Sequence, residues 1–377
     1  MSFNPAAARH NARMQSNQAS RPVPNVPTPL PVNLPDPQVQ AGPVRAEPLP
    51  ADRPVRWGIL ATGKIAGGFA GNLAHLPDAE VAAVGARRLE SAEAFARQHG
   101  GRPHEGYEAL VADPAVDVVY VASPHALHKE HVLLAFEAGK PVLCEKALTL
   151  TADDAAYLVA QARERGLFFM EAMWMRCNPL IRRIQQLLAT GELGPVTQVR
   201  ADLGFRVDHP PTDRLLDPAL GGGALLDMGV YPVTFAHLFL GHPDKVAAVA
   251  ALSEAGADLN LAMSFGYASG AVAALTASMV GPSPCTASIA TDRGRFDLPE
   301  GFHHPVTATW TSEDHVETIE APVIGSGLAN EALEVMRCLR NGETESPLVP
   351  LDETVDLMRL MDDVRRQVGV VYAADRS

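Results

Sequence analysis

Short apolar runs alternate with longer amphipathic stretches through the first half of the chain. Runs rich in Val, Ile, Leu and Ala predict β-strands at residues 55–60, 81–86, 116–122 and 141–146. The stretches between and after them are typical of helices, at residues 61–75, 90–98, 128–138 and 152–164. The strands are apolar throughout rather than alternating, as expected where helices cover both faces of a sheet. This order predicts an α/β fold with a doubly wound parallel sheet and right-handed crossovers.

The rhythm changes after about residue 176. One helix is predicted first, then strands with hairpin-like connections, and finally two helices: the helix 178–190, the strands 196–205, 259–267, 271–280 and 286–291, and the helices 329–339 and 351–368. This pattern predicts a second domain with an antiparallel or mixed sheet and helices on one face. The chain is therefore divided into a first domain at 55–175 and a second at 176–377.

Residues 1–54 differ from the rest of the chain. They contain 12 of the 31 prolines, and Phe3 is their only aromatic residue. Such a segment buries too little apolar area to offset the entropy lost on ordering, so a disordered or polyproline-like arm is expected. It lacks the apolar core of a signal peptide, so export is not expected. The arm is either a dispensable tail or a segment that packs on a neighbouring subunit.

Composition and charge narrow the classes of function. Of the 377 residues, 47% are hydrophobic and 20% are charged, which is globular usage. No apolar run approaches the roughly 20 residues that cross a bilayer, so no membrane contact is expected. The net charge of −13 argues against nucleic acid as a partner. The cysteines form no CxxC pair and are expected to be reduced thiols of a cytoplasmic protein. They are Cys144, Cys177, Cys285 and Cys338.

A glycine-containing turn follows the first strand. Residues 61–66, Ala-Thr-Gly-Lys-Ile-Ala, lead into a helix whose N-terminus suits a pyrophosphate, because backbone N–H groups and the helix dipole favour an anion there. Only the middle glycine of the GxGxxG fingerprint, Gly63, is present, so alone the match also fits an ordinary turn. Ala61 stands where the tight turn prefers glycine, and the turn must tolerate its methyl group. The expected cofactor contacts in this turn are Thr62, Gly63, Lys64 and Ile65.

The end of the second strand selects the cofactor. An NAD-preferring site needs an acidic residue here for the ribose 2′-hydroxyl, whereas this sequence has Arg87 and Arg88. Two guanidinium groups suit a 2′-phosphate, although solvated loop arginines are the alternative. Together with the turn, they favour NADP over NAD.

Polar residues gather at the carboxyl end of the third strand. Ser123 and His125 lie there, at the edge where wound α/β sheets bind ligands. His128 and His131 follow at intervals of three residues, which is suggestive of a metal site. No carboxylate or thiolate stands at ligand spacing, and the motif is one residue short of HxxEH, so no metal is expected. A structural or substrate-facing His128 is preferred.

Two further groups of residues carry chemistry. Glu145 and Lys146 end the fourth strand, and in isolation a structural ion pair explains them equally well. Asp227 and Tyr231 lie four residues apart after three consecutive glycines at 221–223, so on a helix they would share one face.

These motifs resemble the glucose-fructose oxidoreductase/inositol dehydrogenase (Gfo/Idh/MocA) family, and most of all its branch of dimeric dihydrodiol dehydrogenase and NADP-dependent D-xylose dehydrogenase. The similarity extends from about Arg56 to the C-terminus. It rests on Gly58-Ile-Leu-Ala-Thr-Gly-Lys-Ile-Ala, Cys144-Glu-Lys, Glu171-Ala-Met-Trp-Met-Arg and Gly221-Gly-Gly-Ala-Leu-Leu-Asp-Met-Gly-Val-Tyr-Pro. It implies a Rossmann domain followed by an open-faced α/β domain for substrate binding and dimerisation. The sheet of that second domain commonly forms the dimer interface, so a homodimer or a dimer of dimers is expected.

The resemblance also implies roles for single residues. Lys146 occupies the family's catalytic lysine position, and Asp227 and Tyr231 occupy positions near the substrate hydroxyl. His128 matches a histidine that precedes the lysine in this branch. Further expected cofactor contacts are Ser123, His125, His128, Glu145, Trp174 and Arg176, the last two in a motif that begins at Glu171 near the domain junction. The expected substrate contacts are His128, Lys146, Phe205, Asp227 and Tyr231; Asp202, Arg206 and Arg214 either line the pocket or face solvent.

Oxidation of a carbinol requires a proton to leave oxygen while the hydride leaves carbon. A free tyrosine, with a pKa of about 10, is a poor base, and a neighbouring ammonium lowers that pKa. Tyr231 is therefore assigned as the general acid/base. Lys146 is expected to polarise the substrate oxygen and tune Tyr231, while Asp227 holds the lysine. The alternative makes Lys146 itself the base.

One residue departs from the family motif, which continues with proline after the lysine in a bond that is commonly cis. Here the residue is Ala147, for which a cis bond costs about 2.5–4 kcal/mol rather than less than about 1. A trans Lys146–Ala147 bond is therefore predicted.

The sequence thus predicts an NADP-dependent oxidoreductase that transfers hydride between nicotinamide and a carbinol or carbonyl carbon of a sugar, polyol or vicinal diol. One alternative is a non-catalytic NADP-sensing regulator of the same fold, and another is a glycoside hydrolase that uses NAD as a transient oxidant. The set of Lys146, Asp227 and Tyr231 argues against a sensor. Arg87 and Arg88 argue against the NAD-dependent hydrolase.

Overall fold

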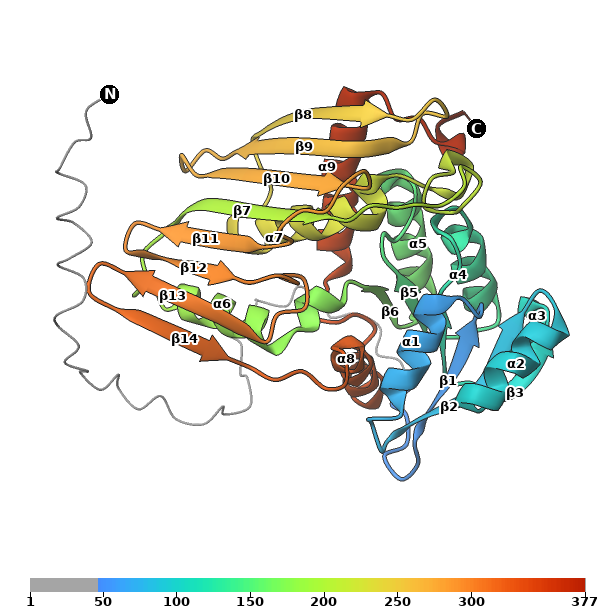
Figure 1. The fold of residues 1–377 in the computed structure, drawn as a ribbon. Coiled ribbons are helices and arrows are strands. Elements are labelled where there is room, and N and C mark those ends of the chain that lie inside the picture. Colours follow the sequence, from blue (N-terminus) through green and yellow to red (C-terminus); the bar gives the residue numbers. More distant parts are fainter. Residues whose placement is uncertain (1–46, 377) are drawn as a thin grey trace, which may run out of the picture. The chain divides into compact units, whose positions relative to one another are not determined.

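The computed structural model describes residues 47–376, so most of the predicted N-terminal arm lies outside the described residues. A six-stranded parallel sheet forms the first half, in the order β3-β2-β1-β4-β5-β6 (Figure 1). Its strands are β1 Val55–Leu60, β2 Ala79–Ala86, β3 Arg102–Glu105, β4 Val118–Val121, β5 Val142–Glu145 and β6 Phe169–Ala172. The connecting helices are α1 Lys64–Leu73, α2 Leu89–His99, α3 Tyr107–Val111, α4 His128–Glu137 and α5 Ala152–Arg165. The order reverses between β1 and β4, which is where open α/β sheets bind ligands.

An eight-stranded sheet follows, in the order β14-β13-β12-β11-β7-β10-β9-β8. Its neighbouring strands are antiparallel except β7 and β10, which run parallel. The strands are β7 Val196–Gly204, β8 Lys245–Leu252, β9 Asp258–Gly266, β10 Val272–Ser278, β11 Ala287–Thr291, β12 Gly294–Leu298, β13 Thr307–Ser312 and β14 Val316–Glu320. The helices are α6 Pro179–Ala189, α7 Val230–Leu240, α8 Leu328–Arg340 and α9 Leu351–Val368. The predicted fold class is confirmed in both sheets.

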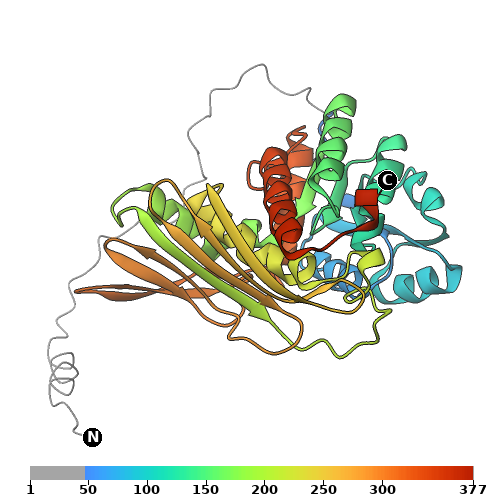
Figure 2. The ribbon, with the colours of Figure 1, turned by 90° about the horizontal axis from the view of Figure 1, so that it is seen from above.

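The second sheet has one covered and one open face. Figure 2 shows helices on one side of it, and α7 and α9 contact β7 and β8 from that side. Along β10 the side chains of Val272, Ala274 and Thr276 are exposed, whereas the residues between them are buried. Alternation of this kind is expected of a sheet with one solvated face.

Local sequence explains where the helices begin. The side chain of Thr151 accepts from Asp154 N at the start of α5, and Asn178 accepts from the first N–H groups of α6, where Pro179 occupies the first turn. By contrast, the N-cap residue of α1 is Gly63, which has no side chain to cap the helix. The first N–H groups of α1 are therefore not satisfied by a capping side chain.

Several elements were not predicted. The edge strand β3 reads Arg-Pro-His-Glu and carries no apolar run, and Pro103 is tolerated because the strand has one free side. The buried strand β6 is only Phe-Met-Glu-Ala, and β12 to β14 are short and largely polar. Short strands without a clear period of two leave little signal in a single sequence.

The last residues of the predicted arm are bonded to the rest of the chain. Residues 47–54 are described, and their backbone bonds to α8: Leu49 N donates to Leu339 O at 3.1 Å, and Arg340 Nη1 donates to Pro50 O at 2.6 Å. Arg53 pairs with Asp117 at 2.5 Å. The prediction of disorder is therefore wrong for these residues, because specific hydrogen bonds replace the missing apolar burial.

One stretch contradicts the expectation that no apolar run reaches membrane-spanning length. Pro218–Leu240 is long and apolar enough by composition, but most of it is buried inside the domain. Burial of this kind is typical of a core helix, and α7 is buried along most of its length.

Candidate active site

Chemically competent residues meet at one edge of the parallel sheet. The turn 61–63 follows β1, Ser123 follows β4, Lys146 follows β5, and Trp174 lies just after β6. The carboxyl ends of parallel strands share one edge, so residues far apart in sequence become neighbours there.

The turn after β1 has the features of an anion site. Ala61 adopts a φ of +83°, so the methyl group is accommodated in a conformation that favours glycine. A Cβ on Gly63 would meet no atom within 4 Å, which leaves open space beside the uncapped start of α1. Arg87 and Arg88 are exposed at the end of β2, the neighbour of β1. Open space, a helix N-terminus without a side-chain cap and two guanidinium groups fit a dinucleotide with a 2′-phosphate.

Lys146 is held by a main-chain oxygen. Its Nζ donates to the carbonyl oxygen of Asp227 at 2.7 Å. Asp227 belongs to a π-helical turn, Leu225–Gly229 (the π-turn), that leads directly into α7. A carbonyl in such a turn is bonded by the N–H five residues on. Here that residue is Pro232, which has no N–H, so no π-type bond competes with Lys146 for this oxygen.

The carboxylate of Asp227 has a different partner. Its Oδ1 lies 3.4 Å from Nη1 of Arg214, a half-exposed residue of the loop after β7. Burial opposes ionisation of Asp227, but the charges of Lys146, His125 and Arg214 lower its pKa overall. The prediction that Asp227 holds the lysine therefore applies to its main chain, and its side chain acts on Lys146 through charge.

Tyr231 lies against both Lys146 and Trp174. Lys146 Nζ is 4.7 Å from the centre of the Tyr231 ring, and Trp174 Nε1 donates to the Tyr231 hydroxyl at 2.7 Å. Burial raises the pKa of Tyr231, and this effect outweighs the Lys146 charge and the Trp174 hydrogen bond, which lower it. The expected net lowering of the Tyr231 pKa is therefore wrong, because the sequence did not reveal how deeply the hydroxyl is buried.

Lys146 is charged in this environment. Burial alone would lower its pKa, but Tyr231, Asp227 and Glu145 raise it overall. An ammonium with a raised pKa is a poor base, and Lys146 Nζ already donates to Asp227 O, so both observations favour Lys146 as a hydrogen-bond donor over the alternative that makes it the base.

The Lys146–Ala147 peptide bond is cis, so the predicted trans bond is wrong. The prediction considered only the local preference of a residue other than proline. Tertiary contacts fix the carbonyl of this peptide bond and the next one: His125 Nε2 lies 3.1 Å from Lys146 O, and His128 Nδ1 lies 3.1 Å from Ala147 O. Contacts of this kind are invisible in the sequence.

His128 holds the loop instead of facing a ligand. It is fully buried, and its Nε2 lies 2.8 Å from Ser123 O while Nδ1 also lies 3.1 Å from Leu148 O. Burial and the neighbouring His125 lower its pKa to about 3, so the ring is neutral at neutral pH. The expected cofactor and substrate contacts of His128 are therefore not seen in this geometry, because backbone carbonyls surround both nitrogens.

A buried glutamate fixes the other side of the lysine loop. Glu171 Oε1 accepts from Leu148 N at 3.1 Å, and Oε2 accepts from the hydroxyl of Thr354 on α9 at 3.2 Å. Burial raises the pKa of Glu171 to about 7. Glu171 thus ties the segment after Lys146 to the last helix.

Other predicted residues face elsewhere. The Glu145 carboxylate is buried and accepts from the Tyr120 hydroxyl and, at 3.3 Å, from Lys146 N. Arg176 is buried, bonds to Leu348 O at 2.9 Å and pairs with Glu353 at the start of α9. The structure does not bring Arg176 to the turn 61–63 (the phosphate turn), because its guanidinium group is bound by Leu348 O and by Glu353 of α9.

Of the pocket residues predicted on β7 and in the loop after it, some lie away from Lys146 and one reaches the site. Asp202 accepts from Cys285 N at 2.7 Å on the open sheet face, away from Lys146. Phe205 and Arg206 are exposed at the end of β7. Only Arg214 reaches the site, through Asp227.

Two histidines were missed. In the loop between β12 and β13, the His303 ring lies 4.8 Å from the Tyr231 ring, and His304 stacks on Trp174 at 5.4 Å. Burial, His304 and Lys146 lower the pKa of His303 to about 3. The only sequence signal was a His-His pair between unpredicted strands. Within the described residues, no group of three or more His, Cys, Asp or Glu side chains could hold a metal ion.

Comparison with known proteins adds independent findings. Residues 55–173 match the oxidoreductase family with an NAD-binding Rossmann fold, and residues 181–297 match the GFO/IDH/MocA C-terminal domain. Trans-1,2-dihydrobenzene-1,2-diol dehydrogenase of Homo sapiens is 36% identical over 334 residues, covering 85% of this chain and 99% of that enzyme. The rabbit enzyme (Oryctolagus cuniculus) is 38% identical over 331 residues, covering 84% and 100%.

Two solved structures are similar to this chain over most of its length. A 3-ketoreductase from Actinomadura kijaniata, in complex with NADP and TDP-benzene, is 30% identical with a TM-score of 0.76, covering 84% of this chain and 98% of that one. Levoglucosan dehydrogenase, in complex with NADH and levoglucosan, has a TM-score of 0.76 at 18% identity, covering 84% and 97%, and supports the fold alone.

Proposed function

Because the chain belongs to the Gfo/Idh/MocA family of oxidoreductases, we propose that it is an NADP-dependent enzyme that interconverts a carbinol and a carbonyl on a sugar, polyol or vicinal diol. The observation that carries this is the placement of Lys146. Its ammonium is bound by Asp227 O and packed on Tyr231, at the sheet edge that also holds the phosphate turn. Dihydrodiol dehydrogenases and an NADP-bound ketoreductase as relatives support the same reaction class.

NADP supplies the hydride acceptor or donor when it is bound. The N-terminus of α1 with Gly63 would hold the diphosphate, and Arg87 with Arg88 would hold the 2′-phosphate. The remaining chemistry, which is placement of the substrate oxygen and transfer of one proton, belongs to the chain's own residues.

The proton is assigned to Tyr231. Its raised pKa keeps the hydroxyl protonated at neutral pH, and the raised pKa of Lys146 keeps the ammonium charged. In this state Lys146 donates a hydrogen bond to the substrate oxygen, and Tyr231 donates a proton to a carbonyl that is being reduced. Oxidation of the carbinol needs the phenolate, so that direction becomes faster at higher pH.

Two other functions are less well supported. A non-catalytic NADP sensor has no need for a buried ammonium placed on a buried tyrosine. A glycoside hydrolase with NAD as a transient oxidant has no need for Arg87 and Arg88. The sensor would be favoured if the chain binds NADPH but reduces neither NADP nor NAD with any sugar or diol.

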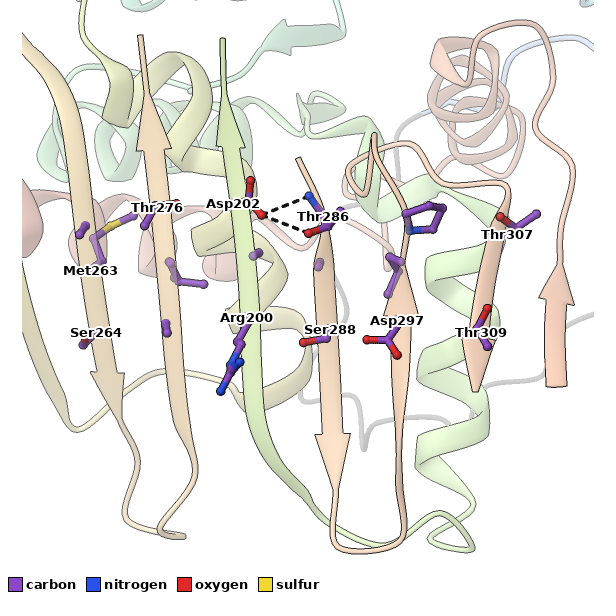
Figure 3. A pocket seen from close by; sticks show the side chains of 17 residues that line it. Arg200, Asp202, Met263, Ser264, Thr276, Thr286, Ser288, Asp297, Thr307 and Thr309 are labelled. Carbon is purple, nitrogen blue, oxygen red and sulfur yellow. Dashed lines mark hydrogen bonds between the residues drawn. The ribbon is translucent and has the colours of Figure 1, made fainter. Parts of the chain in front are cut away.

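We also propose that the open sheet face joins two copies of the chain into a dimer. A hollow of about 860 Å³ lies on this face, lined by β7, β9, β10, β11, β12 and β13; many of the lining side chains are small or carry a hydroxyl group, and Arg200, Asp202 and Asp297 are charged (Figure 3). Arg200 on β7 and Asp297 on β12 lie on the same face. Asp297 already accepts from Arg295 Nε at 2.7 Å within the chain, so a two-fold related copy would add its Arg200 to this ion pair. Val249 on β8 is 70% exposed and extends the apolar surface.

The dimer is tested by its mass in solution. Ala274→Arg, in the middle of this face, is expected to give a monomer in analytical ultracentrifugation. Leu333→Arg, at an exposed apolar position on α8, is the matched control and should leave the dimer intact. A monomeric wild-type chain, or a dimeric Ala274→Arg variant, would overturn the proposal.

A cytoplasmic location is proposed from the cysteines. All four are free thiols in the structure, and three of them are buried. Cell fractionation with a tagged full-length chain tests this, and recovery from an oxidising compartment would contradict it.

The reaction is tested with a substrate panel. D-Xylose, D-glucose, inositol and dihydrodiols are offered with NADP and with NAD, and the absorbance of the reduced nicotinamide is followed. We expect turnover with at least one substrate and a preference for NADP. The absence of turnover on the whole panel with both cofactors would contradict the proposed function.

A further inference from the structure

A buried aspartate anchors the π-turn from the second sheet. Asp258, the first residue of β9, is fully buried, and its Oδ2 accepts from Leu225 N at 2.6 Å. Leu225 is the first residue of the π-turn, where a helix leaves its N–H groups without internal partners. The carboxylate therefore replaces the cap that the sequence does not supply next to the turn.

The approach of Asp258 requires glycine at position 223. Gly223 has a φ of +137°, and a Cβ placed on it would lie 2.2 Å from Asp258 Oδ1. Any side chain here would displace the carboxylate. The third glycine of the Gly221-Gly222-Gly223 run thus makes room for a side chain 35 positions later in the sequence.

Burial destabilises the charged form of the Asp258 carboxylate. No cation pairs with Asp258 in the described part of the chain, and Oδ1 has no hydrogen-bond partner. Burial raises the pKa of Asp258 to about 7, and the hydrogen bonds from Leu225 and its own main chain offset this only in part. A buried, incompletely paired carboxylate destabilises a fold, so stability does not explain why Asp258 stands here.

The π-turn is the element through which Asp258 can act. Two residues after Leu225, the carbonyl of Asp227 accepts from Lys146 Nζ, and four residues after that comes Tyr231. A shift of the first residue of this turn moves both groups relative to the lysine. Asp258 itself contacts neither Lys146 nor Tyr231 through any hydrogen bond of the described residues.

We propose that Asp258 is a positioning residue of the active site, which fixes the π-turn through Leu225 N so that Asp227 O and Tyr231 meet Lys146. This proposal rests on the proposed function, because it assigns Asp258 to the proton-handling site of that reaction. Asp258 supports the chemistry without touching the substrate or cofactor.

The experiment compares three variants with one control. Asp258→Ala removes the acceptor, and Asp258→Asn keeps an acceptor oxygen of the same reach. Gly223→Ala displaces the unaltered carboxylate and also strains the backbone at its φ of +137°. The control is Asp113→Asn, another buried aspartate that caps a turn, accepting from Ala115 N at 2.8 Å at the opposite, amino end of the first sheet. For each, kcat, KM, the Kd for NADPH from fluorescence, and hydrogen exchange over residues 221–232 are measured.

Asp258→Ala and Gly223→Ala are expected to lower kcat on the order of 10- to 100-fold, the effect of a small misplacement of reacting groups. The Kd for NADPH should change little, since neither Asp258 nor Leu225 N makes a hydrogen bond to the turn 61–63 among the described residues. Hydrogen exchange over 221–232 should accelerate. Asp258→Asn should recover most of kcat, and Asp113→Asn should leave kcat unchanged.

The proposal is overturned if Asp258→Ala keeps wild-type kcat, if Asp258→Asn is no better than Asp258→Ala, or if NADPH binding weakens in step with kcat. Should Asp258→Ala not fold, Asp258→Asn and Gly223→Ala still decide the outcome. If the wild type turns over no substrate, the proposed function has failed. Hydrogen exchange over 221–232 then still shows separately whether Asp258 anchors the turn.

Discussion

Lys146 and Asp227 are joined through the main chain: Lys146 Nζ donates to Asp227 O at 2.7 Å, while the Asp227 carboxylate pairs with Arg214 at 3.4 Å. A carbonyl oxygen orients the ammonium without neutralising it. The carboxylate, which is largely buried nearby, adds a negative charge that helps to keep the lysine protonated. Asp227 therefore orients the lysine through its main chain and, together with Tyr231 and Glu145, keeps the lysine protonated.

Pro232 keeps the Asp227 carbonyl available to the lysine. Pro232→Ala would place an N–H at the π-type position and let it compete for this oxygen. A competing hydrogen bond is worth about 1 kcal/mol, so kcat is expected to fall roughly fivefold. Steady-state kinetics check this. Pro179→Ala, a proline in the first turn of α6, is the matched control, and an equal effect of both changes would contradict the explanation.

Trp174 favours the phenolate of Tyr231 by donating to its oxygen. Trp174→Phe removes the donor and keeps an aromatic ring, so the pKa of Tyr231 should rise further. The rise of the oxidation rate with pH should then move to higher pH, as seen in a pH profile of kcat. A profile that stays in place, or moves to lower pH, would mean that Tyr231 does not carry the proton.

Arg87 and Arg88 should determine the cofactor. Changing both to Ala removes the guanidinium groups expected at the 2′-phosphate, so KM for NADP should rise on the order of 10- to 100-fold. KM for NAD should change little. Arg97→Ala, in the last turn of α2, is the control. An equal loss for both cofactors would show that these arginines do not read the 2′-phosphate.

Glu171 should make stability depend on pH. Burial raises its pKa from 4.5 to about 7, so the folded chain binds this proton more tightly than the unfolded chain does. Its contribution to the free energy of unfolding is fully present below about pH 4.5 and is lost as the pH rises to 7, by roughly 3 kcal/mol.

The glutamine variant isolates this effect. Urea unfolding of Glu171→Gln at pH 5 and pH 8 should show a smaller loss of stability with rising pH than the wild type. Glu137→Gln, at an exposed position on α4, should keep the wild-type difference. An unchanged pH dependence in Glu171→Gln would contradict a raised pKa.

The fold could be predicted where the hydrophobic pattern was long and regular. Helix α9 has the predicted bounds Leu351–Val368, and β1 has the predicted bounds Val55–Leu60. Short strands such as β6 and the polar edge strand β3 left no such pattern. The family could be predicted because its motifs lie at strand ends and turns, where the residue type itself carries the signal. The matches to the two family domains confirm it.

The site could be predicted only as a set of residues. Lys146, Asp227 and Tyr231 do lie together, but which atom of Asp227 binds the lysine depends on the π-turn, and a π-turn has no period that a sequence reveals. The peptide bond after Lys146 depends on His125 and His128, and the pKa of Tyr231 depends on burial. All three depend on contacts between segments that are distant in the sequence.

The central claim is that Lys146 serves the chemical step and not the binding of the cofactor. The most direct measurement compares Lys146→Ala with the wild type on the best substrate of the panel, together with NADPH binding by fluorescence. The account predicts a loss of kcat of about 10²- to 10⁴-fold with NADPH affinity retained. Wild-type turnover by Lys146→Ala would contradict it, and so would a loss of activity explained entirely by failure to bind NADPH.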